Sequence, residues 1–251
     1  MTPGDAELAE RQHASHIAFY ERAAERVERR GSLLVAVSPG VPDRSLPNAV
    51  LYEDPAEVIA ALPELTALYD GEGVRAWTVW VRPGDDELAA ALAAAGHAHD
   101  GKPMQMAAGL DELDLTVPDG LEIVPVDDWA VVGAVNDRAY GVGGFAALLA
   151  GFGDTDGAWL ALVDDEPAAT AAVLEQAGDA YVCLVATDPQ YRGRGLCRGL
   201  MAHALGVARD HGCTTTTLEG SPMGEPIYAR MGYRSLGRFG LWERRNGNST
   251  A

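Results

Sequence analysis

Short apolar runs separated by polar turns follow one another in the second half of the chain. Three runs, at residues 159–165, 167–176 and 181–187, are rich in alanine, valine and leucine and have the length of β-strands. The segments Asp164-Asp165-Glu166 and Ala177-Gly178-Asp179 separate them. Aspartate and glycine favour tight turns because they tolerate the left-handed backbone conformation. The pattern therefore predicts three successive strands joined by short turns.

A helix is predicted after the third strand. Between residues 194 and 210 the apolar positions recur at i, i+3 and i+4, which places them on one face of a helix. Gly212 follows and suits the left-handed conformation that ends many helices. A further short strand is predicted at residues 213–219. This mixture of strands and helices indicates an α/β fold.

The first half of the chain repeats the same organisation. Residues 75–81 form an apolar run, and an alanine-rich helix is predicted at residues 85–95. A shift of 136 positions brings Gly96 onto Gly232, each at the turn after a predicted helix. A repeat of this length indicates a duplicated domain, because the units of solenoid proteins are only ~20–50 residues long.

We therefore predict two domains, at residues 1–115 and 116–251, with residues 107–119 as the connection. A chain of 251 residues is long enough to form two small domains.

Composition and charge restrict the partners of this chain. Hydrophobic residues make up 47% and charged residues 22%, which is typical of a globular protein. The net charge of -18 argues against binding to nucleic acid. The longest uncharged run, residues 139–153, is shorter than a membrane span, and the first residues do not resemble a signal peptide. Cys183, Cys197 and Cys213 are odd in number, and no cysteine–histidine cluster has zinc spacing. We expect a cytoplasmic protein with reduced thiols and no metal site.

The turn between the third strand and its helix carries the main clue to chemistry. Arg192, Arg194 and Arg198 alternate there with Gly193 and Gly195, in a chain that is otherwise acidic. The first N–H groups of a helix have no partner within the helix, and the helix dipole adds positive charge at that end. Glycine lets a phosphate approach closely. The turn is therefore predicted to bind a phosphate group.

Two common phosphate-binding motifs do not fit this turn. A P-loop requires Gly-Lys-Ser/Thr, and the only lysine, Lys102, is followed by Pro103. A dinucleotide-binding motif requires a third glycine where Arg198 stands, and Gly199 comes one residue late.

The stretch resembles the acyl-CoA-binding motif of the GNAT superfamily of N-acetyltransferases, Arg/Gln-x-x-Gly-x-Gly/Ala. Here it is Arg192-Gly193-Arg194-Gly195-Leu196-Cys197, with a cysteine in place of the usual small last residue. Downstream, Tyr228 followed by Gly232-Tyr233 resembles the closing segment of the same family. The resemblance covers residues 120–245. Together with the repeat of organisation in the first half, it implies two tandem GNAT-like domains. Each would have a twisted, antiparallel-rich sheet flanked by helices.

The resemblance also implies a site and a reaction. Acetyl-CoA would be the co-substrate. The backbone of Val185, Ala186 and Thr187 would pair with its pantetheine arm, and the N–H groups from Arg192 to Cys197 would hold its pyrophosphate. Glu219 would accept the proton of the attacking amine, and Tyr228 would donate to the departing thiolate. These chemical roles are those of general acids and bases positioned at a thioester.

The first half lacks the features of this site. The segment Ala56-Glu57-Val58-Ile59 stands where the glycine turn would be, and Leu92 stands at the position of Tyr228. We expect no CoA binding there, and a supporting role for that half.

Other functions remain open from the sequence alone. The chain could be a non-catalytic acyl-CoA sensor or scaffold, or it could bind another nucleotide phosphate. The acceptor would be a small-molecule or peptide amine, selected by the segment around residues 138–156 and by the first half. The sequence leaves a homodimer open.

Overall fold

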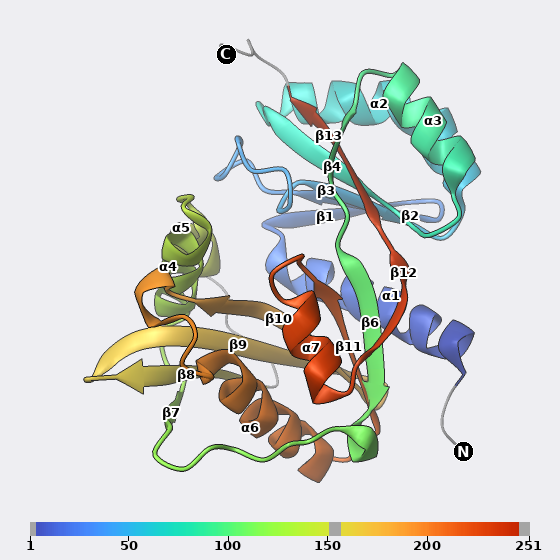
Figure 1. Cartoon of the computed structure of the whole chain (residues 1–251). Coiled ribbons are helices and arrows are strands. Elements are labelled where there is room, and N and C mark those ends of the chain that lie inside the picture. Colours follow the sequence, from blue (N-terminus) through green and yellow to red (C-terminus); the bar gives the residue numbers. More distant parts are fainter. Residues whose placement is uncertain (1–3, 151–156, 246–251) are drawn as a thin grey trace. The chain divides into compact units, whose positions relative to one another are not determined.

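The structure is a computed structural model, in which residues 4–150 and 157–245 are described (Figure 1). The chain folds into two compact units, each with a mixed sheet and helices. Unit 1 consists of Met1–Phe19 and Met104–Leu236, and unit 2 of Tyr20–Pro103 and Gly237–Ala251. The predicted α/β class is therefore confirmed. Among the described residues, none of the helices combines the length and the apolar character that a membrane crossing needs.

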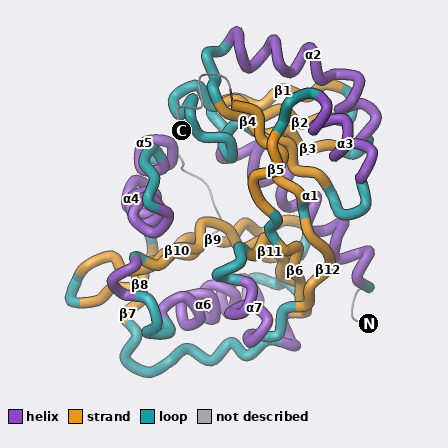
Figure 2. Tube along the Cα trace, turned by 45° about the horizontal axis from the view of Figure 1, so that its top comes forward, coloured by secondary structure: helices purple, strands orange, loops and turns teal. Residues whose placement is uncertain are grey.

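Unit 1 is built on a seven-stranded sheet in the order β12-β6-β11-β10-β9-β8-β7. From β6 to β7, neighbouring strands of this sheet pair antiparallel except for β10 and β11, which pair in parallel. Helices α6 and α7 cover one face, and α4 and α1 up to Phe19 cover the other (Figures 1 and 2). The strands are β6 (Met104–Gly109), β7 (Glu122–Pro125), β8 (Gly157–Val163), β9 (Glu166–Gln176), β10 (Asp179–Thr187), β11 (Thr215–Gly220) and β12 (Arg234–Arg238). The helices are α1 (Asp5–Ala23), α4 (Trp129–Tyr140), α5 (Phe145–Leu149), α6 (Leu196–Asp210) and α7 (Glu225–Met231), and short 3₁₀ turns lie at Leu110–Glu112 and Pro189–Tyr191.

Unit 2 has a six-stranded sheet in the order β1-β2-β3-β4-β13-β5. Apolar side chains of α2 and α3 pack against strands of this sheet and enclose a second core, in which Trp77 stacks on Tyr69. Its strands are β1 (Arg26–Arg30), β2 (Leu33–Val37), β3 (Ala49–Tyr52), β4 (Ala76–Val81), β5 (Ala98–Gly101) and β13 (Gly240–Arg245), and its helices are α2 (Pro55–Gly71) and α3 (Asp86–Ala94).

Each sheet contains one strand from the other half of the sequence. Strand β6 lies between β11 and β12, and β13 lies between β4 and β5. The two halves have therefore exchanged equivalent strands, which supports the predicted repeat of organisation. The exchange also means that the compact units do not follow the predicted boundary between residues 115 and 116.

The predicted connection is wrong at its start. Residues 107–109 belong to β6, where they pair with Thr217, Thr216 and Thr215 of β11. Their backbone groups complete the sheet of unit 1, so the connection begins only after Gly109. The residues after Gly109 lead to β7 through the 3₁₀ turn.

The two turns predicted between the strands of unit 1 are confirmed. Asp164 and Asp165 have φ of 53° and 64°, and Ala177 and Gly178 have φ of 49° and 82°. Two consecutive residues in the left-handed region are characteristic of the tightest β-hairpins.

Candidate active site

The strands β10 and β11 separate near the middle of the unit 1 sheet. They pair only over Asp179–Tyr181 and Thr215–Thr217 in the described part of the chain. On its other side β10 pairs with β9, and there the register shifts between Cys183 and Ala186. Leu184, inside this bulge, has a φ of 53°, which is costly for a leucine. The bulge turns the end of β10 away from β11 and opens the sheet at this point.

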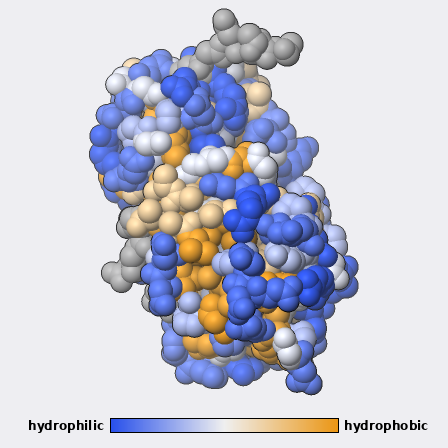
Figure 3. All heavy atoms as spheres, turned by 90° about the vertical axis from the view of Figure 1, so that its left-hand side faces the viewer, coloured by the Kyte–Doolittle hydropathy of each residue, from blue (hydrophilic) through white to orange (hydrophobic). Residues whose placement is uncertain are grey.

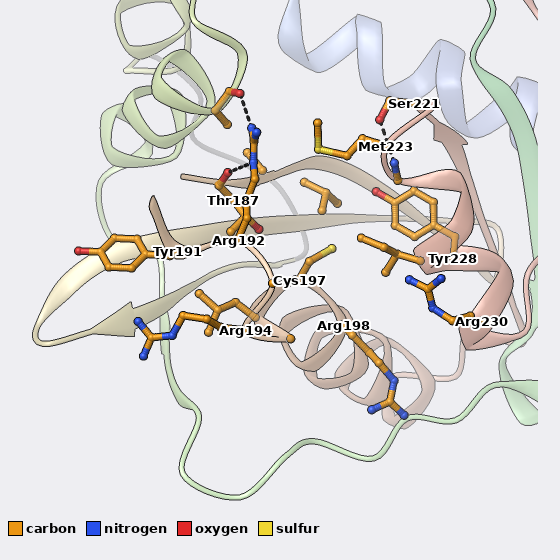
Figure 4. Close-up of a pocket in the computed structure, with 18 of the residues that line it drawn as sticks. Thr187, Tyr191, Arg192, Arg194, Cys197, Arg198, Ser221, Met223, Tyr228 and Arg230 are labelled. Atoms are coloured by element: carbon orange, nitrogen blue, oxygen red, sulfur yellow. Dashed lines mark hydrogen bonds between the residues drawn. The ribbon is translucent and has the colours of Figure 1, made fainter. Parts of the chain in front are cut away.

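A cavity of about 680 Å³ lies at the opening. Figure 4 shows it at the junction of the end of β10, the turn after it, the start of α6 and the start of α7. All nine residues predicted to bind the cofactor line it, together with the predicted catalytic tyrosine, Tyr228. The nine are Val185, Ala186, Thr187, Arg192, Gly193, Arg194, Gly195, Leu196 and Cys197.

The glycine turn has the geometry of an anion-binding loop. Gly193 and Gly195 have φ of 78° and 77°, and a Cβ atom at either position would meet no other atom within 4 Å. Gly195 is the N-cap of α6 and has no side chain to accept the first helical N–H groups. These groups and the positive end of the helix dipole are therefore available to a ligand in the cavity.

The arginines of the turn have different roles. Arg192 is held by the backbone: its Nη2 donates to the Ala139 carbonyl at 2.7 Å and its Nε to that of Thr187 at 3.3 Å. Arg194 lies over the ring of Tyr191, with 5.9 Å between the guanidinium carbon and the ring centre.

Two further arginines line the cavity. Arg198 forms an ion pair with Asp114, and Arg230 comes from α7 (Figure 4). Arg230 was not predicted, because it lies far from the motif in sequence. Arginine side chains thus surround the cavity in an acidic protein, which favours a ligand with phosphate groups.

Tyr228 is buried, with 7% of its surface exposed, and Figure 4 shows its ring within the cavity. Burial raises the pKa of its hydroxyl well above the usual value, and Cys197, Tyr140 and Tyr233 add to the shift. The hydroxyl is therefore protonated at neutral pH and can donate a hydrogen bond. Burial also raises the pKa of the Cys197 thiol to about 11, so this cysteine is not a thiolate nucleophile at neutral pH.

Glu219 lies on β11 but does not line this cavity. Its carboxylate accepts hydrogen bonds from the Tyr181 hydroxyl at 2.5 Å and from Nε2 of Gln12 at 2.7 Å. Burial raises its pKa to about 7, although the hydrogen bonds from these two donors act to lower the pKa. A carboxyl group with this pKa exists in both protonation states at neutral pH and can accept a proton.

The two predicted catalytic residues are thus not brought together in one cavity. Leu218, the neighbour of Glu219, packs in the core together with Tyr228, Met106 and residues of α6. Side chains alternate along a strand, so Glu219 points to the opposite face, where Gln12 of α1 reaches it. Both residues lie near the place where β10 and β11 separate.

Some further residues of the site carry no motif that marks them individually in the sequence. Tyr140 and Met223 line the cavity although 57% and 63% of their surfaces are exposed, and the Tyr140 hydroxyl donates to the Val185 carbonyl at 3.2 Å. Apolar surface gathers in the middle of the unit 1 part of Figure 3, bordered by hydrophilic surface. Residues 151–156, part of the segment expected to select the acceptor, lie outside the described residues. Groups of histidine, cysteine and acidic side chains that could hold a metal are absent from the described residues.

Known proteins share this architecture. The chain is similar to a GCN5-related N-acetyltransferase from Kribbella flavida, with 23% identity, a TM-score of 0.71, and coverage of 95% of this chain and 96% of that one. A GCN5-related N-acetyltransferase from Sphaerobacter thermophilus has 17% identity, a TM-score of 0.63, and coverage of 98% and 96%. A tandem GNAT protein from the clavulanic acid biosynthesis pathway has 14% identity, a TM-score of 0.59, and coverage of 99% and 98%. At these identities the likeness shows the fold.

A family model also matches part of the sequence. No curated protein matches it, but the acetyltransferase (GNAT) family model matches residues 132–233. That range contains most of α4, the separated strands β10 and β11, the glycine turn and Tyr228. The fold is that of tandem GNAT domains, and residues 132–233 form a segment that matches the acetyltransferase (GNAT) family.

Proposed function

We propose that this protein transfers an acetyl group from acetyl-CoA to an amine, and that the cavity of unit 1 binds acetyl-CoA. The observation that carries the proposal is the position of the cavity. It connects the gap beside β10 with the glycine turn at the start of α6. A ligand with a phosphate at one end and an amide-containing arm at the other fits such a site, because helix N–H groups suit the phosphate and strand backbone suits the arm.

The residues present fit this ligand. Gly193 and Gly195 leave open space where any other residue would place a Cβ atom. Arg194, Arg198 and Arg230 supply positive charge around the cavity. Acetyl-CoA would supply an acetyl thioester, whose C–S bond breaks as the amine forms a C–N bond.

Glu219 is suited to remove the proton from the amine. An alkyl ammonium group with a pKa of ~10 is about 0.1% neutral at pH 7, so a base is needed to release the nucleophile. The pKa of about 7 leaves part of the Glu219 population ionised at neutral pH and able to accept this proton, directly or through water.

Tyr228 is suited to assist the departing thiolate. Its protonated hydroxyl can donate a hydrogen bond, and the high pKa makes full proton transfer unfavourable. Backbone N–H groups of the β10 bulge can stabilise negative charge on the carbonyl oxygen.

Unit 2 is suited to support rather than to bind CoA. The N-terminus of α2 is capped by Asp54, whose side chain accepts from the Ala56 N–H. Glu57 in the first turn adds negative charge and accepts from the Ser32 N–H. These carboxylates occupy the N-terminus of α2, where a phosphate would bind, and their negative charge would repel it.

A non-catalytic acyl-CoA sensor is the alternative. The presence of both a base with a raised pKa and a protonated tyrosine favours an enzyme. The three cysteines are free thiols, which suits a reaction in the reducing cytoplasm.

A screen for turnover tests this proposal. The protein is incubated with acetyl-CoA and a panel of small amines, amino acids, amine-containing antibiotics and peptides with a free N-terminus, and release of free thiol is followed. Thiol release that depends on one class of amine is expected. Saturable binding of acetyl-CoA without amine-dependent release across the panel would favour the sensor.

A further inference from the structure

The N-terminal helix α1 reaches the candidate base from outside the GNAT-matched segment. Its residues up to Phe19 belong to unit 1, and several of its side chains contact β10 or β11. Gln12, Ser15 and His16 are all buried, with exposed fractions of 0%, 0% and 2%. Ser15 donates to Asp179 of β10 at 2.8 Å, whereas Gln12 and His16 lie beside Glu219.

Gln12 makes two hydrogen bonds to one stretch of β11. Its Nε2 donates to the carbonyl of Leu218 at 2.7 Å and to Oε1 of Glu219 at 2.7 Å. Both partners are acceptors, which requires the NH₂ end of the amide at this position. The other end, Oε1, is buried and has no hydrogen-bond partner in the described structure.

An unpartnered buried amide oxygen is costly, and a methionine or leucine at position 12 would avoid the cost. Burial of glutamine here is thus not explained by packing alone. Unlike methionine or leucine, the amide supplies a neutral hydrogen-bond donor, which binds both the backbone carbonyl of Leu218 and the carboxylate of Glu219.

Among the groups around Glu219, Gln12 is the side chain with a hydrogen bond to Oε1 in the described structure. Tyr181 donates to the second carboxylate oxygen. His16 lies 3.6 Å from Oε1, but burial and His13 lower its pKa to about 3, so it is neutral and does not pair as a cation. Asp179 and Cys183 on β10 also act on the site, and neither brings positive charge.

We infer that Gln12 is a positioning residue for the proposed reaction: it fixes the carboxylate of Glu219 from α1 and stabilises its ionised form. The inference rests on the proposed function of Glu219 as the base. It means that the active site is completed by a helix from the opposite end of the chain.

A titration of Glu219 in the intact protein tests the inference without an acceptor. The protein is labelled with ¹³C at the glutamate carboxyl groups, the Glu219 signal is assigned with Glu219→Gln, and its midpoint is measured by NMR. Gln12→Met removes the donor at similar size, so the midpoint should rise by about one pH unit, because a hydrogen bond to the charged form is lost.

Gln105→Met is the matched control. Gln105 is also a buried glutamine at the interface of α1 with the sheet, and it lies directly opposite Glu219 in the pairing of β6 with β11, but its Nε2 donates to the Ala9 carbonyl at 3.3 Å instead of to Glu219. This variant should leave the Glu219 midpoint within a few tenths of a unit. Gln12→Glu is the second variant, should Gln12→Met fail to fold. It keeps the shape of the side chain and places a second carboxyl group beside Glu219. Two neighbouring carboxyl groups share a proton, so one of the two titration midpoints should rise further than in Gln12→Met.

Once an acceptor is known, kcat/KM can be measured against pH. In Gln12→Met its acidic limb should shift to higher pH by the same amount as the Glu219 midpoint, and the rate should recover at higher pH. An unchanged Glu219 midpoint in a folded Gln12→Met or Gln12→Glu variant would overturn the inference. Normal turnover of Glu219→Gln would instead overturn the proposed base, whatever the effect of Gln12.

Discussion

The hydroxyl group of Tyr181 donates a hydrogen bond to Oε2 of Glu219 across 2.5 Å, in a site that water does not reach freely. The ring of Tyr181 stacks on His16, with 5.9 Å between the ring centres. The carboxylate of Glu219 is therefore held in one orientation although it is buried.

Glu219→Gln tests this carboxylate as the base. The amide keeps the shape but accepts no proton, so kcat should fall by about 10²-fold or more, as for the loss of a general base. The KM for acetyl-CoA should change little, because Glu219 does not line the cavity. Steady-state kinetics at pH 7 and pH 9 measure both values. A kcat within about twofold of the wild type at both pH values would remove Glu219 from the mechanism.

The same variant makes a prediction about stability. The pKa of Glu219 is raised in the folded state from 4.5 to about 7, so the folded protein holds this proton more tightly than the unfolded chain. The protonated Glu219 makes its full contribution to the free energy of unfolding below about pH 4.5. This contribution is lost as the pH rises to about 7. Relative to the wild type, Glu219→Gln should therefore be more stable at pH 8 than at pH 4. Melting temperatures of both proteins at the two pH values check the sign, and a constant difference would show that the pKa is not raised.

Tyr228→Phe tests the proposed donor to the thiolate. Loss of one positioned hydrogen bond in the transition state should lower kcat about 10–10³-fold. Acetyl-CoA affinity and the melting temperature should stay close to the wild type, because the ring and its packing remain. A structural role predicts the reverse: lower stability with near-normal turnover per folded molecule.

Gly195→Glu tests the glycine turn. The side chain would enter the cavity with a negative charge, so binding of acetyl-CoA should be lost. Because Gly195 has a φ of 77°, the substitution also strains the backbone. Gly212→Glu is the matched control, at a φ of 103° beyond the other end of α6 and with open space around it. The control should lose stability and still bind, and equal loss of binding in both variants would point to strain alone.

The local pattern of the sequence predicted the parts of the site that are built locally. The strand, the glycine turn and the helix of residues 181–210 are adjacent in the chain, so their geometry follows from turn residues and helix periodicity. The nine cofactor residues all line one cavity for this reason. Their role in binding remains a prediction.

The long-range features were not predictable in the same way. β6 and β13 are strands of six residues each, and nothing in either strand specifies which sheet it joins. The environment of Glu219 depends on Gln12, more than two hundred residues earlier in the chain. Buried glutamine, serine and histidine on a helix also resemble a solvated face in sequence.

Titration calorimetry with acetyl-CoA tests the central claim most directly, with ATP and NAD as competitors for a phosphate site. The site in unit 1 and the capped helix in unit 2 predict one acetyl-CoA per chain, with no comparable binding of ATP or NAD. Two sites per chain, no binding of acetyl-CoA, or equal binding of ATP would contradict this account.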